Sequence, residues 1–201
     1  MSEAASKPRK RDITRARVIQ AAIDCIYREG FNAAHTNKIV EEAGVTWGVL
    51  QYHFGDKDGL MQAVLDRIFA DFAQAFADAD IHHADLRERI DALIELIWSL
   101  VSRPEYRVSV AILRNAGRDP DSKVEGSAHL DSWAREIATT WNRIFDDTSA
   151  SPARSQAARR IVFATLRGLA DEINPSGKTQ KQQLKQEFAA LGDATHHLLT
   201  H

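Results

Sequence analysis

Five side chains from Thr46 to His53 carry hydrogen-bonding or aromatic groups at a spacing that suits recognition of another polar surface. If this segment is helical, Leu50 and Phe54 lie four residues apart and share an inward face. The opposite face then presents hydroxyl, indole, amide, phenol and imidazole groups. Such groups bind the edges of nucleic-acid bases or grip phosphates. The residues on this outer side are Thr46, Trp47, Gly48, Gln51, Tyr52 and His53.

A short helix and a glycine turn must position this face. Thr36 is expected to cap a first helix whose Ile39 and Ala43 point inward. Gly44 supplies the backbone freedom that ends this helix, and Thr46 can cap the second helix. The spacing predicts a helix-turn-helix, in which the second helix meets the major groove of DNA. Because a helix, a glycine turn and a helix also occur in all-α proteins that bind no nucleic acid, the turn alone does not decide the function.

Positive charge near both ends of this segment favours nucleic acid. Residues 1–17 hold six Lys or Arg against two acidic residues, a net charge of +4, whereas the whole chain carries −2. Residues 61–201 carry −3, so the basic charge is concentrated where phosphates would lie, and the acidic remainder opposes indiscriminate coating of DNA. The cations expected at phosphates are Lys10, Arg11, Arg15 and Lys57.

Residues 14–60 resemble the tetracycline-repressor-like (TetR) transcriptional regulators. Three stretches carry the resemblance: TRARVIQAAIDCIYREGF, then T-x-x-x-I-x-x-x-A-G-V, then W-G-V-L-x-x-H-F-x-x-K-x-x-L. The resemblance implies a homodimeric, all-helical regulator whose N-terminal helices bind an operator. It also implies C-terminal helices that hold a small-molecule inducer and the dimer interface. We expect a repressor on a palindromic operator, although the sequence does not decide between repression and activation. The positions that this family uses against DNA are occupied by Thr36, Thr46, Trp47, Gly48, Gln51, Tyr52, His53 and Lys57.

Gln51 departs from the family pattern, which most often has Tyr at this position. A usual phosphate contact is therefore in doubt. The amide of Gln51 can instead pair bidentately with the N6 and N7 edge of adenine, which would make it a base-reading residue.

The remainder of the chain shows helical periodicity without strand-like alternation, so we expect an all-α fold. Gly, Pro, Asp and Ser between Asn115 and Ser127 predict an exposed loop. The domain prediction is a flexible basic arm over 1–11, a helix-turn-helix domain over 12–57, and a helical ligand-binding and dimerisation domain over 58–201. The later helices are expected over 58–78, 85–102, 105–115, 130–145, 152–174 and 180–199.

A strip of small residues in the helix over 152–174 suggests where two copies associate. A second backbone can approach closely at Ala164 and Gly168. These residues fit packing within one subunit equally well, but a single helix-turn-helix covers few base pairs and needs a second copy for useful specificity. The expected dimer contacts are Ala157, Ile161, Ala164 and Gly168.

Large aromatic residues with interspersed Arg and His suggest a ligand chamber in the C-terminal body. Each of them is individually expected to be an ordinary core or surface residue, since aromatic residues at helical spacing usually pack. As a group they could line a cavity for a small, largely apolar effector. The candidates are Trp98, Tyr106, Arg107, Arg114, His129, Trp133, Trp141 and Phe163.

Other classes of protein find little support. Only His82, His83, His129 and Asp131 could suggest an enzyme, and they match no metal-ligand, nucleophile or phosphate-loop spacing, so we expect neither catalysis nor a cofactor. No apolar run approaches the length of a membrane span, and the N-terminus lacks the pattern of a signal peptide, which predicts a cytoplasmic protein with no membrane partner. The alternative retained is a ligand-binding or protein-binding helical dimer that has lost operator binding.

Overall fold

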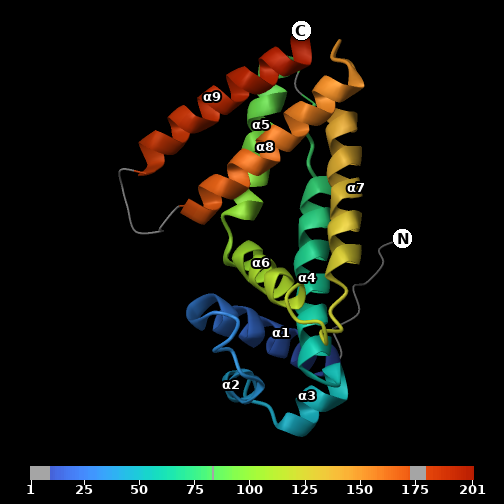
Figure 1. The fold of residues 1–201 in the computed structure, drawn as a ribbon, viewed down its shortest axis with the longest axis vertical. Helices are drawn as coiled ribbons and strands as arrows, with labels where there is room; N and C mark the ends of the chain where they lie inside the picture. The colour runs from blue at the N-terminus through green and yellow to red at the C-terminus, as the bar shows by residue number, and fades with distance from the viewer. Residues whose placement is uncertain (1–9, 83, 173–179) are drawn as a thin grey trace, which may run out of the picture. The chain divides into compact units, whose positions relative to one another are not determined.

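The structure is a computed structural model that describes residues 10–82, 84–172 and 180–201 (Figure 1). In these residues the regular structure is α-helix throughout, which confirms the expected all-α fold. Among the described residues, no helix is both long and apolar enough to span a lipid bilayer. The helices are α1 (Lys10–Glu29), α2 (Thr36–Glu42), α3 (Trp47–Phe54), α4 (Lys57–Ala77), α5 (Leu86–Val101), α6 (Pro104–Ala116), α7 (Gly126–Phe145), α8 (Pro152–Glu172) and α9 (Gln180–Thr200).

The chain forms two compact units, and neither is continuous in sequence. One comprises Met1–Phe69 and Arg107–His129, and the other comprises Ala70–Tyr106 and Leu130–His201. The predicted boundary at residue 57 falls inside the first of these units. The unit that holds the helix-turn-helix also takes in the first part of α4, most of α6 and the loop that follows α6.

The first unit, called here the N-terminal unit, is organised around α1. Val18, Ala22 and Ile26 recur every four residues along this helix and are buried, as the periodicity predicts. Helices α2 and α3 lie on the same side of α1 (Figure 1) and contribute the buried Ile39 and Leu50 to the core. Cys25 is also fully buried, and burial raises the pKa of its thiol, so it behaves as a small core residue.

The second unit, called here the C-terminal unit, is built on the mutual packing of α5, α8 and α9. Asp85 caps α5 by accepting a hydrogen bond of 3.0 Å from the backbone N–H of Glu88. Arg87 on α5 pairs with Asp193 on α9, and Arg89 forms a double hydrogen bond with Asp147. The Arg87–Asp193 ion pair thus links α5 to α9, and the Arg89–Asp147 pair links α5 to the segment that follows α7.

Six helix starts differ from the sequence expectations, and those of α4 at Lys57 and α5 at Leu86 differ by a single residue. Helix α1 begins at Lys10, so Lys10 and Arg11 are helical rather than part of an arm over 1–11, and residues 1–9 lie outside the described residues. The N-cap of α2 is His35, not Thr36, which is already the first helical residue. Pro104 is the first residue of α6, and α7 starts at Gly126, four residues before the predicted position.

Candidate nucleic-acid interface

The turn between α2 and α3 has the geometry that the sequence predicts. Gly44 has a φ of +60°, a left-handed conformation that favours glycine. Its N–H donates to the carbonyl of Glu41 at 3.0 Å, and the N–H of Val45 donates to the carbonyl of Val40 at 3.1 Å. Thr46 is the N-cap of α3 with extended backbone, although its side chain does not cap the helix. The turn thus ends α2 at Glu42, and α3 starts at Trp47, three residues after Gly44.

Helix α3 presents a polar and aromatic face to solvent. Tyr52 is 70% exposed and Trp47 is 47% exposed, which is unusual for residues of this size. Thr46, Gly48 and Gln51 are also exposed, and His53 is half-buried. On the opposite side Leu50 is fully buried and Phe54 is half-buried, so the predicted division of α3 into two faces holds.

Basic side chains from α1 lie over the aromatic rings of α3. The guanidinium carbons of Arg11 and Arg15 are each 5.4 Å from a ring centroid, of Tyr52 and Phe54 respectively. At the start of α4 the Lys57 ammonium lies 4.6 Å from the ring centroid of Phe31. Cation–π attraction at this range holds the charges near the surface without removing them from water. The fold therefore places Arg11 beside the exposed face of α3, Arg15 over Phe54 on the opposite side of that helix, and Lys57 at the start of α4 over Phe31.

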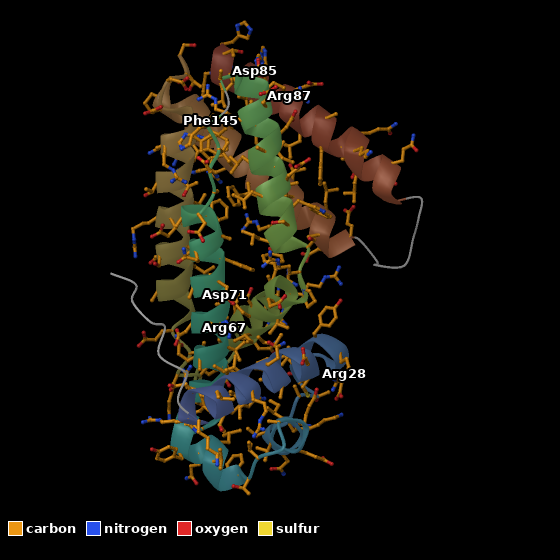
Figure 2. The ribbon with its side chains drawn as sticks, turned by 180° about the vertical axis from the view of Figure 1, so that it is seen from behind. Arg28, Arg67, Asp71, Asp85, Arg87 and Phe145 are labelled. Atoms are coloured by element: carbon orange, nitrogen blue, oxygen red, sulfur yellow. The ribbon has the colours of Figure 1, made fainter. Side chains whose placement is uncertain are left out.

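Two ion pairs join α1 to α2 and fix the first helix of the turn. Arg28 (Figure 2) donates two hydrogen bonds to the carboxylate of Glu42, at 2.9 and 2.7 Å, and Lys38 pairs with Glu29. The hydrogen bond from Arg28 holds the pKa of Glu42 below its ordinary value, and the one from Lys38 does the same for Glu29. Two parallel hydrogen bonds fix the orientation of Arg28 and Glu42 more closely than a single bond would, although the pair lies at the surface.

The junction between α3 and α4 depends on two glycines and one carboxylate. Gly55 ends α3 with a φ of +77°. Asp56 then accepts a hydrogen bond of 2.8 Å from the N–H of Gly59, and this bond holds the pKa of Asp56 below its ordinary value. A Cβ atom on Gly59 would lie 2.0 Å from the carbonyl oxygen of Phe54, so only glycine fits at this position. This junction sets the direction in which α4 leaves α3.

The structure brings together most of the predicted DNA-binding residues. All of them belong to the N-terminal unit, on α1, α2, α3 and the start of α4. Thr36 is half-buried at the first position of α2, and the others are exposed apart from His53 and Lys57, which are half-buried.

The sequence reading missed two supporting features, the Arg28–Glu42 pair and the fit of Gly59 against Phe54. For Gly59, the sequence did offer one related signal: Asp56 stands three residues earlier, which is the spacing of a helix N-cap. The pair joins residues fourteen apart on different helices, which no local pattern reveals.

The predicted ligand-chamber residues divide between the two units. Arg107, Arg114 and His129 belong to the N-terminal unit, and the other five belong to the C-terminal unit. The side chain of His129 lies outside the described residues. The eight residues are therefore not one group within a single compact unit.

Within the C-terminal unit the aromatic residues form separate clusters. Trp133 packs edge-on to Phe76 with ring centroids 5.1 Å apart, and Phe163 stacks on Phe76 at 6.2 Å. Trp141 is buried and donates a hydrogen bond of 2.9 Å to the hydroxyl of Ser155. The ring contact of Trp98 is with Phe188 on α9. These contacts are those of core residues, the ordinary outcome for aromatic residues at helical spacing.

The small-residue strip on α8 is open. Ile161 is 44% exposed, Ala164 and Gly168 are exposed, and Ala157 is half-buried. A Cβ atom on Gly168 would have no neighbour within 4 Å from outside its own part of the helix. The strip is consequently accessible to a second chain.

Comparison with known proteins agrees with this geometry. The family model for bacterial regulatory proteins of the tetR family matches residues 18–64, the segment that contains α2 and α3. The chain is 32% identical over 96 residues to the HTH-type transcriptional repressor NicS of Pseudomonas putida, an alignment that covers 47% of this chain and 45% of NicS. It thus spans less than half the length of that relative.

Two further similarities extend beyond the helix-turn-helix. The chain is 25% identical over 161 residues to the HTH-type transcriptional regulator BetI of Burkholderia lata, covering 79% of this chain and 83% of BetI. Among solved structures, GusR of Salmonella enterica superposes with a TM-score of 0.73 over 96% of this chain and 99% of its own, at 20% identity. At that identity the superposition shows a shared fold.

Proposed function

We propose that the chain is a transcriptional regulator of the tetR family, whose model matches residues 18–64, and that it binds double-stranded DNA through the exposed face of α3, its recognition helix. The observation that carries this proposal is the solvent-facing row of Trp47, Gln51 and Tyr52 on a helix that follows a glycine turn. In this arrangement the row would read base edges in the major groove. Arg11 and Arg15 of α1 would lie against the flanking phosphates.

We further propose that the protein works as a homodimer on a palindromic operator and acts as a repressor in the cytoplasm. The open strip on α8 supports this, since a second α8 could pack there through Ile161, Ala164 and Gly168. The name of NicS, a repressor, supports the direction of regulation. In this scheme a small molecule bound to the C-terminal unit would release the operator by binding the DNA-free conformation more tightly.

A mobility-shift titration on DNA from upstream of the protein's own gene tests the DNA-binding proposal. We expect a shift that Tyr52→Ala weakens, because Tyr52 is 70% exposed on the proposed face and its ring also contacts the guanidinium of Arg11. Tyr27→Ala is the matched control, since Tyr27 is also exposed, at 42%, but lies outside the proposed face. Binding should also weaken steeply as salt rises, because the cations would release counterions from phosphates.

Two results would contradict the proposal. Equal loss of binding in both tyrosine variants would place the DNA contact elsewhere. Failure of the wild-type protein to bind any fragment of its upstream DNA would favour the alternative, a helical dimer that binds ligands or proteins but no operator.

A further inference from the structure

The loop between α6 and α7, residues 117–125, is attached to the first turns of α4 within the N-terminal unit. The backbone N–H of Lys123 donates to a carboxylate oxygen of Asp58 at 2.7 Å, and the N–H of Glu125 donates to the side-chain oxygen of Gln62 at 2.8 Å. The ammonium of Lys123 lies 3.4 Å from a carboxylate oxygen of Asp56. Three contacts thus bring a distant part of the chain to the junction that follows the recognition helix.

Two carboxylates at this junction would repel a DNA phosphate. Asp56 and Asp58 flank Lys57, a residue expected at a phosphate. Charges are screened only beyond about 8–10 Å at physiological salt, so a phosphate close enough for Lys57 would also be repelled by its neighbours. Asp58 accepts a backbone N–H from the loop, which brings no net charge, and the ammonium of Lys123 is the cation that faces Asp56.

We propose that Lys123 is a positioning residue of the DNA interface, which offsets the charge of Asp56 and so raises operator affinity without contacting DNA. This inference rests on the proposed function. It assigns the loop between α6 and α7 a role in recognition, although that loop lies outside the helix-turn-helix. It also accounts for the tolerance of an acidic residue next to Lys57, since Asp56 is needed to cap α4 through Gly59.

A double-mutant cycle on operator affinity tests the proposal. Lys123→Met removes the compensating charge, and we expect it to weaken binding by about two- to fivefold, the range of an exposed ion pair. Asp56→Asn removes the repelling charge but keeps a side-chain oxygen that can accept from the N–H of Gly59, and it should bind at least as tightly as wild type. In the Asp56→Asn background, Lys123→Met should then have little further effect. Lys123→Arg keeps the charge and should bind like wild type.

Arg118→Met is the matched control, because Arg118 lies in the same loop, is exposed and carries the same charge. Its effect should be the same with Asp or Asn at position 56. Each variant is checked for a wild-type circular dichroism spectrum and melting temperature before titration.

The outcomes separate this inference from the proposed function. If Lys123→Met weakens binding equally in both backgrounds, Lys123 attracts the phosphates directly, by contact or through space, and the proposed compensation of Asp56 is overturned. If Lys123→Met leaves wild-type affinity unchanged, the charge of Asp56 has no effect at the interface and the proposal is again overturned. Failure of the wild-type protein to bind DNA would instead contradict the proposed function.

Discussion

Gly59→Ala offers the sharpest test of how the recognition helix is held, because a single added carbon meets a rigid neighbour. The new Cβ would lie 2.0 Å from the carbonyl oxygen of Phe54 and 3.1 Å from its carbonyl carbon. Contacts of a Cβ atom shorter than 3.0 Å are essentially never seen in proteins, so the backbone at this point must move by about 1 Å. That movement would disturb the last turn of α3 and the cap that Asp56 places on α4.

The expected destabilisation follows from two opposed effects. Replacing glycine with alanine inside a helix stabilises by roughly 0.5–1 kcal/mol. Forcing extra volume against a fixed backbone costs typically about 1–3 kcal/mol, and the contact here is at the severe end. We therefore expect a net loss of about 2 kcal/mol in the free energy of unfolding. For a chain of this size that corresponds to a fall in melting temperature of roughly 4–8 °C.

Thermal melts followed by circular dichroism, at matched protein concentration, measure this loss, and operator titration measures its effect on function. Gly48→Ala is the control, since its Cβ would have only the hydroxyl of Thr46 nearby, at 3.9 Å. It should melt at or above the wild-type temperature yet bind DNA more weakly, because it lies on the exposed face. If Gly59→Ala melts like Gly48→Ala and binds DNA like wild type, the junction does not constrain α3.

Three further predictions address the interface, the stability and the assembly. Gln51→Ala should change base preference within each half-site at a cost of about 1–3 kcal/mol, and equal losses on all sequences would show a phosphate contact instead. Glu42→Gln should be less stable than wild type at neutral pH. Because the pKa of Glu42 is lowered in the folded state, this difference should disappear as the pH falls from about 4.5 through that lowered pKa, and urea unfolding at several pH values would show whether it does. Gly168→Leu should yield monomers or aggregates in light scattering, whereas an intact dimer would place the interface away from this strip.

The sequence was a good guide wherever one helix face decides burial. Leu60, Val64, Ile68, Phe72 and Phe76 recur every four residues, and all five are buried along α4. The turn at Gly44 was equally predictable from the sequence, because few residues other than glycine adopt its φ of +60°. Periodicity and turn chemistry depend on neighbouring residues in the chain, and for this reason they can be predicted without knowledge of the tertiary structure.

The sequence was a poor guide wherever distant segments meet. Nothing in the spacing of Trp98 and Trp133 shows that the first packs on Phe188 and the second on Phe76. Thr36 has the chemistry of a cap, but the helix begins one residue earlier than that role requires, with His35 at the cap position. The attachment of Lys123 to Asp58, sixty-five residues away, likewise has no local signal.

The discontinuous N-terminal unit limits how this protein can be recombined with its relatives. A chimera joined at residue 57, the domain boundary that the sequence predicts, would combine the first turns of α4 from one parent with the residues between α3 and α4 from another. The recognition helix would then precede a foreign Gly59 and Asp58, and Asp56 would face a foreign residue 123. A graft that carries residues up to Phe69 together with Arg107–His129 keeps all of these partners from one parent. Under the proposed function, exchanging the DNA specificity of this chain requires the transfer of two segments rather than one.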